Sequence, residues 1–309
     1  MNLGKKQLEK QGYRFTGQHS SVKICEWTKR ALKNEGTCYK QKFYGINTHQ
    51  CVQMTPSMVC PNRCVFCWRS LDYYNSEDMK EFDDPKEIIK NAVKSQKDLL
   101  YGFGGNSKVN QETLKESLKP RHFAISLTGE PTIYPKLNEF LIELHKQKFT
   151  SFLVTNGMYP EALENLKELP TQLYLSLDAP TKELYKKVDN PMLEDYWERF
   201  NKSLEIVSKL NTRTVIRITS VKEINMSNEE DYAKLIKKGK PLFVEIKAYS
   251  WVGESRLRLT EENVPSYDEC YDFAKTIANL IDYKIIDTHR ESKAILLAKE
   301  DPEDRLLKF

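Results

Sequence analysis

Short apolar runs alternate with longer amphipathic stretches along most of the chain. The runs have the length of strands, and the longer stretches repeat apolar residues at helical spacing. The predicted strands are 50–55, 122–127, 151–155, 172–177, 212–219 and 242–249, and the predicted helices are 85–98, 137–147, 161–169, 196–210 and 229–237. Strands separated by helices are typical of βαβ units and a parallel sheet. Six strands predict an α/β fold, a partial (βα)6 barrel of the TIM type.

Both ends of the chain are expected to extend this barrel. A helix over 267–280 precedes two apolar runs, 283–288 and 294–299, which we expect to pair as an antiparallel edge. Residues 70–120 hold an acidic helix and a glycine-rich stretch, and are interpreted as an insertion or lid. The predicted segments are a basic N-terminal extension (1–49), the partial barrel (50–255) and a C-terminal helix with edge strands (256–309).

Composition and charge narrow the class of protein. Hydrophobic residues make up 39% and charged residues 30% of the chain. No stretch approaches the ~18 apolar residues of a membrane span, and the first residues do not resemble a secretory signal. We therefore expect a cytoplasmic monomer. Residues 1–50 carry ten Lys and Arg against three Asp and Glu. Such a basic segment indicates an anionic macromolecular partner, and a solvated helical face is the alternative interpretation.

Six of the seven cysteines fall between residues 25 and 67. In a cytosolic chain, clustered thiols indicate metal ligands rather than disulfides. Structural zinc usually takes four ligands, whereas three cysteines leave one iron of a [4Fe–4S] cluster open. Cys270 lies alone in a predicted helix and is interpreted as core. The other six form two triplets, Cys25, Cys38 and Cys51 at intervals of 13 residues, and Cys60, Cys64 and Cys67 in a compact loop.

The compact triplet stands in a recognisable context. The pattern Cys60-x3-Cys64-x2-Cys67 directly follows the first barrel strand, with Phe66 before the last cysteine, and it resembles the radical S-adenosylmethionine signature. In such barrels the active-site groups sit at the C-terminal strand ends. The next three strand ends carry motifs in the order expected of that superfamily: Thr128-Gly129-Glu130-Pro131-Thr132, Thr155-Asn156-Gly157 and Ser176-Leu177-Asp178.

Residues 38–70 narrow the resemblance to the tRNA 4-demethylwyosine synthases, the radical enzymes of wybutosine biosynthesis. The resemblance implies a lyase that condenses N1-methylguanosine-37 of tRNA-Phe with pyruvate. It also implies two [4Fe–4S] clusters, the second held by Cys25, Cys38 and Cys51. Eukaryotic members carry an additional flavodoxin-like domain. The chain looks like the archaeal form, so we expect an external electron donor of the ferredoxin or flavodoxin type.

The same resemblance implies roles for single residues. Lys40 is the candidate for a Schiff base with pyruvate, and Lys42 is its neighbouring competitor. Alternatively, the open iron of the second cluster chelates pyruvate, or Lys40 only contacts tRNA or solvent. Lys247 is a weaker candidate for the active site, and Arg217 is expected to hold the carboxylate of S-adenosylmethionine; for both, a surface salt bridge is the alternative. The residues expected to bind S-adenosylmethionine are Phe66, Gly129, Glu130, Asn156, Ser176, Asp178 and Arg217.

The target base must leave the anticodon loop to reach a radical inside a barrel. Two groups of basic residues are candidates for RNA phosphates: Lys5, Lys6, Lys10, Arg14, Lys23, Lys29, Arg30 and Lys33, and then Lys115, Lys119 and Arg121. Two other functions remain open from the residues alone. One is a different radical enzyme such as a glycyl-radical activase, and the other is a non-catalytic iron–sulfur or zinc module that binds RNA.

Overall fold

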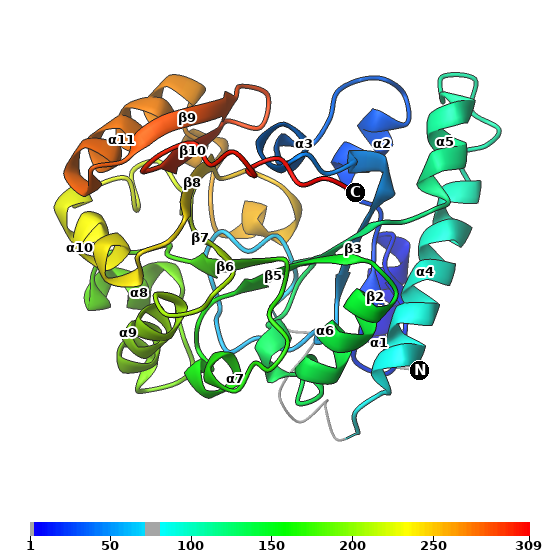
Figure 1. Ribbon diagram of the computed structural model, residues 1–309, viewed down its shortest axis with the longest axis horizontal. Coiled ribbons are helices and arrows are strands. Elements are labelled where there is room, and N and C mark those ends of the chain that lie inside the picture. Colours follow the sequence, from blue (N-terminus) through cyan, green and yellow to red (C-terminus); the bar gives the residue numbers. More distant parts are fainter. Residues whose placement is uncertain (1–2, 72–80) are drawn as a thin grey trace.

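The computed structural model describes residues 3–71 and 81–309, and one sheet runs through all three predicted segments. Its strand order is β1-β2-β3-β4-β5-β6-β7-β8-β10-β9 (Figure 1). Neighbouring strands from β3 to β8 are parallel. These strands are β3 (Cys51–Thr55), β4 (His122–Ile125), β5 (Thr150–Thr155), β6 (Gln172–Ser176), β7 (Arg213–Ser220) and β8 (Phe243–Ala248). The prediction of an α/β partial barrel with six parallel strands is confirmed.

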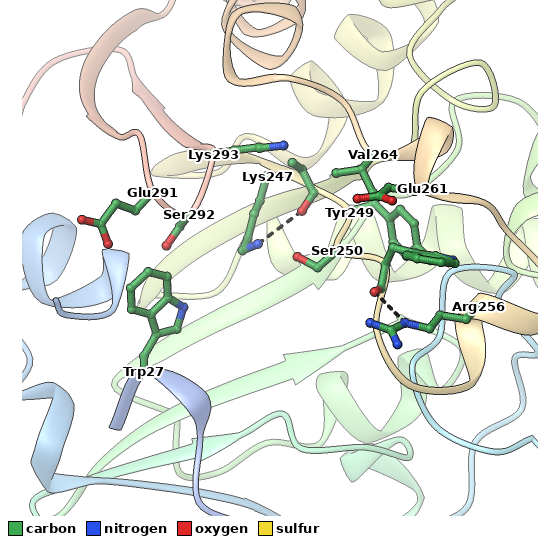
Figure 2. A pocket seen from close by; sticks show the side chains of 12 residues that line it. Trp27, Lys247, Tyr249, Ser250, Arg256, Glu261, Val264, Glu291, Ser292 and Lys293 are labelled. Carbon is green, nitrogen blue, oxygen red and sulfur yellow. Dashed lines mark hydrogen bonds between the residues drawn. The ribbon is translucent and has the colours of Figure 1, made fainter. Parts of the chain in front are cut away.

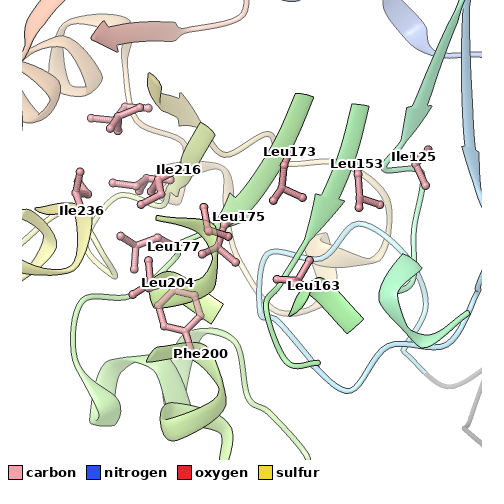
Figure 3. Packing of buried hydrophobic residues seen from close by; sticks show 14 of the residues in the cluster. Ile125, Leu153, Leu163, Leu173, Leu175, Leu177, Phe200, Leu204, Ile216 and Ile236 are labelled. Carbon is pink, nitrogen blue, oxygen red and sulfur yellow. The ribbon is translucent and has the colours of Figure 1, made fainter. Parts of the chain in front are cut away.

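Helices cover the outer face of this sheet because alternate strand residues on that side are apolar. Leu153, Leu173 and Ile216 lie there in one buried cluster with helix residues such as Leu163 and Leu204 (Figure 3). The helices are α4 (Pro85–Tyr101), α5 (Gln111–Ser117), α6 (Leu137–Lys146), α7 (Pro160–Glu164), α8 (Lys182–Val188), α9 (Tyr196–Val207), α10 (Glu229–Gly239) and α11 (Tyr267–Ile281). Short 3-10 turns occupy Thr48–Gln50, Pro131–Ile133, Gly253–Leu257 and Glu261–Asn263. No described helix has the length and apolar character needed to cross a membrane.

The interpretation of residues 70–120 as an insertion or lid is wrong for helix α4. This helix connects β3 to β4 and buries Ile88, Ile89 and Ala92 in the outer core, as the first crossover helix of a barrel must. Its start follows ordinary capping rules, since the Asp84 carboxylate accepts hydrogen bonds from two backbone amides of the first turn and Pro85 follows. Residues 72–80 of the predicted insertion lie outside the described residues.

Both ends of the chain join the sheet. β10 pairs antiparallel with β8 and with β9, which confirms the predicted C-terminal edge. At the other edge β2 pairs antiparallel with β3, and β1 with β2. These additional elements are α1 (Leu3–Lys10), β1 (Arg14–Phe15), β2 (Ser21–Val22), α2 (Glu26–Ala31), α3 (Tyr39–Tyr44), β9 (Lys284–His289) and β10 (Ala294–Ala298). The N-terminal segment is therefore part of the sheet and contributes its own edge strands.

Helix α3 packs against the inner face of the barrel. Its aromatic residues lie in one buried cluster with inward-facing strand residues such as Phe152 and Phe243. The carboxylate of Glu245, fully buried on β8, accepts hydrogen bonds from Tyr39 Oη at 3.0 Å and from Tyr44 Oη at 2.5 Å. Aromatic packing and these two hydrogen bonds fix α3 inside the barrel, and with it the side chains that α3 carries.

Candidate active site

The compact cysteine triplet lines a cavity at the carboxyl ends of the parallel strands. This radical cavity has a volume of about 190 Å³ and contains Cys60, Cys64 and Cys67 in its wall. Asn156 Nδ2 lies 3.5 Å from Cys60 Sγ, so the motif after β5 reaches the cysteine loop. Six of the seven residues predicted to bind S-adenosylmethionine line the same cavity, namely Phe66, Gly129, Glu130, Asn156, Ser176 and Asp178. The cysteine loop and the motifs at three successive strand ends therefore meet in one site.

The turn after β4 is held in place by Gly129 and Glu130. Gly129 has φ +68°, and a Cβ atom at this position would lie 1.9 Å from the carbonyl oxygen of Ser57. The Glu130 carboxylate accepts hydrogen bonds from Thr155 Oγ1 at 2.7 Å and from the Asn156 amide at 2.8 Å. It also accepts from the amide and hydroxyl of Thr132. Burial raises the pKa of Glu130, and these hydrogen bonds act in the opposite direction. Glu130 thus joins the ends of two strands.

Two charged residues of this cavity were not anticipated from the sequence. Arg69 is buried, lies close to Cys60 and Cys67, and donates a hydrogen bond to the carbonyl of Met58. Asp189 Oδ1 accepts a hydrogen bond from Cys64 Sγ at 3.3 Å. A basic residue two positions after Cys67 was visible in the sequence, but nothing there linked the distant Asp189 to the loop.

The donors of the radical cavity fit an iron–sulfur cluster with a polar ligand at its open iron. Within the described residues, no three Cys, His, Asp or Glu side chains converge as they would around one metal ion. A cubane cluster needs a wider arrangement, because each cysteine binds a different iron. Burial raises the pKa of Cys60 to about 11, so a metal must displace this proton. Thr128 Oγ1 is buried in the cavity wall without a hydrogen-bond partner among the described residues, which leaves it available to a ligand.

The second triplet lines a separate inner cavity of about 150 Å³. Cys25 and Cys38 directly precede helices α2 and α3, and Cys51 begins β3. The three basic residues of the wall are Lys40, Arg217 and Lys247, and the described lining contains no carboxylate. Cavities for drug-sized ligands are usually about 300–1,000 Å³. The inner cavity is therefore suited to a small anion.

Lys40 extends from α3 into this inner cavity. Its Nζ lies 4.4 Å from the ring centroid of Tyr174 and 5.4 Å from that of Phe152. Burial lowers the pKa of Lys40, and burial also lowers the pKa of Lys247 to about 8. Lys42 lies elsewhere, because its Nζ forms an ion pair with Asp287 at 2.9 Å and its side chain is half-exposed. Lys40 and Lys42 were the two candidates for the Schiff base with pyruvate, and of these Lys40 is the one whose side chain lies inside the barrel.

Arg217 lines a different cavity from the other six residues predicted to bind S-adenosylmethionine. It is absent from the lining of the radical cavity and lines the inner cavity beside Lys40. The expectation that Arg217 holds the carboxylate of S-adenosylmethionine is therefore not supported by its position. Its side chain is on the inner face of β7, opposite Glu245 of β8 in the parallel register. Lys247, a weaker candidate in the sequence, lines the same inner cavity.

Three neighbouring cavities share lining residues. Ser126, after β4, lines both the radical cavity and the inner cavity. Trp27 and Lys247 line both the inner cavity and a larger outer cavity of about 560 Å³. Figure 2 shows Lys247 in this outer cavity, between Trp27 on one side and Tyr249, Glu261 and Arg256 on the other. The inner cavity therefore adjoins the radical cavity at Ser126 and the outer cavity at Trp27 and Lys247.

The predicted basic patches have different surroundings. Several N-terminal cations are paired, since Lys29 contacts Glu26 at 3.2 Å and Arg30 contacts Glu291 at 3.4 Å. The second patch, Lys115, Lys119 and Arg121, lines a cavity at the amino ends of β3 and β4 that shares no lining residue with the three cavities described above. Glu112 and Glu116 line the same cavity. RNA contact by either patch stays a prediction.

Comparison with known proteins decides the family. Residues 54–236 match the radical SAM superfamily, and residues 238–299 match the family described as wyosine base formation. The S-adenosyl-L-methionine-dependent tRNA 4-demethylwyosine synthase of Pyrococcus abyssi is 46% identical over 300 residues, which cover 95% of this chain and 88% of that protein. The chain belongs to the tRNA 4-demethylwyosine synthase family. The resemblance found in residues 38–70 is thus confirmed.

Solved structures of this family agree with the fold. A structure of TYW1 with a lysine–pyruvate adduct bound has a TM-score of 0.89 and 33% identity, covering 99% of both chains. The crystal structure of archaeal TYW1 has a TM-score of 0.81 and 31% identity, covering 99% of this chain and 100% of that one. As a radical SAM protein of the 4-demethylwyosine synthase family, the chain is of a type that uses S-adenosylmethionine and a [4Fe–4S] cluster.

Proposed function

We propose that this chain is a lyase that joins N1-methylguanosine-37 of tRNA-Phe to pyruvate and forms the tricyclic base 4-demethylwyosine. The observation that carries the proposal is the inner cavity, in which Lys40 lies beside a cysteine triplet and which adjoins the radical cavity at Ser126. A glycyl-radical activase has no use for this second triplet, and a non-catalytic RNA-binding module has no use for the strand-end motifs.

In the radical cavity the chain's own residues hold and orient the reactants. Cys60, Cys64 and Cys67 would bind the cluster, and the residues of the three strand-end motifs would surround S-adenosylmethionine. When bound, these groups supply a 5′-deoxyadenosyl radical that removes a hydrogen atom from the N1-methyl group. Glu130 keeps the ends of β4 and β5 together, so that the cavity wall does not rearrange as the ligands bind.

Lys40 is the residue proposed to form a covalent link with pyruvate. The neutral amine attacks the C2 carbonyl carbon, the carbonyl oxygen leaves as water, and an imine remains. Burial favours the neutral amine because it lowers the pKa of Lys40. The lysine–pyruvate adduct in the TYW1 structure shows that a family member supports this chemistry. Lys247 also lines the inner cavity and is the competing nucleophile, whereas Lys42 is held outside by Asp287.

Arg217 is proposed to bind the carboxylate of pyruvate. Its Nε is buried and has no hydrogen-bond partner among the described residues. The nearest carboxylate in register, Glu245, already accepts hydrogen bonds from Tyr39 and Tyr44. The guanidinium therefore keeps donors available for a small carboxylate, for which its planar fork is well suited. Lys247 adds a second positive charge to the same cavity.

The proposal includes a second [4Fe–4S] cluster at Cys25, Cys38 and Cys51. Their thiols share one cavity wall, and burial raises the pKa values of Cys38 and Cys51 to about 12, so binding a cluster requires loss of these protons. An open iron at this position could hold pyruvate together with Lys40. The remaining parts of the proposal are an external ferredoxin or flavodoxin as electron donor, tRNA as a cytoplasmic substrate, and a monomeric enzyme.

Borohydride trapping with labelled pyruvate tests the role of Lys40. We expect label on the wild type and on Lys42→Ala, and no label on Lys40→Ala. Retained labelling of Lys40→Ala together with loss in Lys247→Ala would transfer the role to Lys247. Equal labelling of all four proteins would reject a Schiff base in this cavity.

The complete reaction is tested with N1-methylated tRNA-Phe, pyruvate, S-adenosylmethionine and dithionite. Formation of the tricyclic base supports the proposal, and its absence with fully reconstituted wild type rejects it. Iron content tests the second cluster separately. We expect about eight irons per chain, falling to about four when Cys25, Cys38 and Cys51 are all replaced by Ala. About four irons in the wild type would exclude a second cluster.

A further inference from the structure

The outer cavity is lined by aromatic and charged side chains that the proposed chemistry of the inner cavity does not use. Its volume of about 560 Å³ lies within the range of ligand pockets. Two of the chain's four tryptophans, Trp27 and Trp251, line it. Both are half-buried, so each keeps part of its surface open to solvent. The charged lining residues of the cavity are Lys247, Arg256 and Lys293 together with Glu261 and Glu291, so the cavity is suited to a flat aromatic ligand that carries both donor and acceptor groups.

Cations support both tryptophans. The Arg30 guanidinium lies 4.7 Å from the ring centroid of Trp27, and the Arg256 guanidinium lies 4.7 Å from that of Trp251. Arg256 also donates a hydrogen bond to the backbone carbonyl of Trp251. This hydrogen bond orients the Arg256 side chain in the cavity (Figure 2). Aromatic rings flanked by basic residues are the usual means by which proteins hold unstacked bases and their phosphates.

The outer cavity is built from the part of the chain that distinguishes this family. Eleven of its twelve lining residues fall within residues 238–299, the segment that matches the wyosine base formation family, and Trp27 is the exception. The general radical SAM match ends at residue 236. All but one of the residues that line this cavity therefore lie in the segment that matches the wyosine base formation family, and not in the segment that matches the radical SAM superfamily.

Backbone contacts tie one wall of this cavity to the cysteine loop. Gly253 has φ +59°, and a Cβ atom there would lie 2.1 Å from the carbonyl oxygen of Trp68. The amide of Glu254 donates to the same carbonyl at 3.0 Å. Arg258 Nε donates to the carbonyl of Val65 at 3.1 Å, and its Nη2 donates to that of Cys67. The wall that carries Trp251 and Arg256 is thereby held at a fixed position relative to the radical cavity.

We propose that the outer cavity holds the purine base that is flipped out of the RNA substrate, stacked against its tryptophans. This inference rests on the proposed function. The N1-methyl group must meet both the radical and the three-carbon acid, so the Watson–Crick edge faces Lys247 and extends into the inner cavity, which adjoins the radical cavity at Ser126. The ribose and its phosphates then lie away from the inner cavity, on the side where Arg256 supplies positive charge.

Binding of two labelled anticodon stem-loops tests this site in the reconstituted enzyme. One RNA carries N1-methylguanosine at the target position, and the other carries an abasic site there. Stacking predicts that the wild type binds the first RNA about 5- to 150-fold more tightly than the second. We expect Trp27→Leu and Trp251→Leu to reduce that ratio toward one without weakening the binding of the abasic RNA. Leu257→Ala, in the same loop as Arg256 but with an exposed side chain, is the matched control and keeps the ratio.

Iron content establishes that the variants are loaded equally, which matters for Trp27 because Cys25 is two residues away. A wild-type ratio near one, or an unchanged ratio in both tryptophan variants, overturns the inference. Product formation by the wild type separates this result from failure of the proposed function. An active wild type with unaffected tryptophan variants refutes the base site alone, whereas an inactive wild type that traps no pyruvate refutes the function on which it rests.

Discussion

Replacing Gly129 by Ala is expected to separate the turn after β4 from the cysteine-bearing segment. The new Cβ atom would lie 1.9 Å from Ser57 O, 2.8 Å from Ser57 C and 2.9 Å from Met58 C. All three are backbone atoms, so no side-chain rotation can relieve the overlap. The adjacent hydrogen bond from the Glu130 amide to the Val59 carbonyl, 2.7 Å long, joins the same two segments and would lengthen as they move apart.

The cost of Gly129→Ala can be assembled from these contacts. A left-handed φ costs a non-glycine residue about 1–2 kcal/mol. Overpacking against backbone costs about 1–3 kcal/mol, and the weakened hydrogen bond costs about 0.5–1.5 kcal/mol. The expected loss is about 3–6 kcal/mol in the free energy of unfolding, out of the ~5–15 kcal/mol that a typical protein has. Chemical denaturation measures this loss, and equilibrium dialysis measures the accompanying loss of S-adenosylmethionine binding.

Gly105→Ala is the matched control for this experiment. A Cβ atom at Gly105 meets nothing within 4 Å, and its φ is not in the left-handed region. Its free energy of unfolding should change by no more than about 0.5 kcal/mol. A loss below about 1 kcal/mol in Gly129→Ala, or equal losses in the two variants, would refute the reasoning that close backbone approach requires glycine at this turn.

Three further changes have defined outcomes. Arg217→Lys keeps the positive charge but loses the planar fork of the guanidinium. It should raise the KM for pyruvate by about 10- to 100-fold in steady-state assays and leave S-adenosylmethionine binding unaffected. An unchanged KM would remove Arg217 from the pyruvate site. Glu130→Gln places an amide N–H either against the Asn156 backbone amide, which donates to Glu130 Oε2, or against the Thr132 backbone amide, which donates to Oε1. We expect a loss of about 1–3 kcal/mol by chemical denaturation, and wild-type stability would contradict the hydrogen-bond assignment. Burial lowers the pKa of His122 from 6.5 to about 3, so between these pH values the unfolded chain binds a proton that the folded chain does not. Lowering the pH from 7 to 5 should therefore remove about 2 kcal/mol of stability that His122→Asn does not lose, and equal pH dependence of the two proteins in denaturant titrations would show that His122 is not responsible.

The parallel sheet and the radical cavity were predictable because their signals are local. Strand lengths and helical spacing located β3 to β8, and each motif directly follows a strand. Since the carboxyl ends of parallel strands share one edge, residues as distant as Cys60 and Asp178 could be assigned to one site. The edge strands β1 and β2 were missed because two residues cannot show a periodic pattern.

Periodicity alone could not predict the inner cavity, because the cavity depends on the six-residue helix α3; the family resemblance was the signal that grouped its three cysteines with Lys40. Lys40 and Lys42 are two residues apart on α3, and at about 100° per residue their side chains point in nearly opposite directions. One therefore lies inside the barrel and the other pairs with Asp287. Arg217 posed a related difficulty. Alternation along β7 indicates a face of the sheet, but not which of two cavities on that face the side chain lines.

The wall shared by the outer and inner cavities also predicts an order in which the substrates bind. An RNA base seated in the outer cavity covers Trp27 and Lys247, the two residues through which that cavity adjoins the inner one. If pyruvate enters by way of the outer cavity, it must arrive before the RNA, and the tricyclic product must leave before a second molecule of pyruvate can be captured. Steady-state kinetics should accordingly follow a compulsory order, in which high concentrations of RNA inhibit competitively with respect to pyruvate.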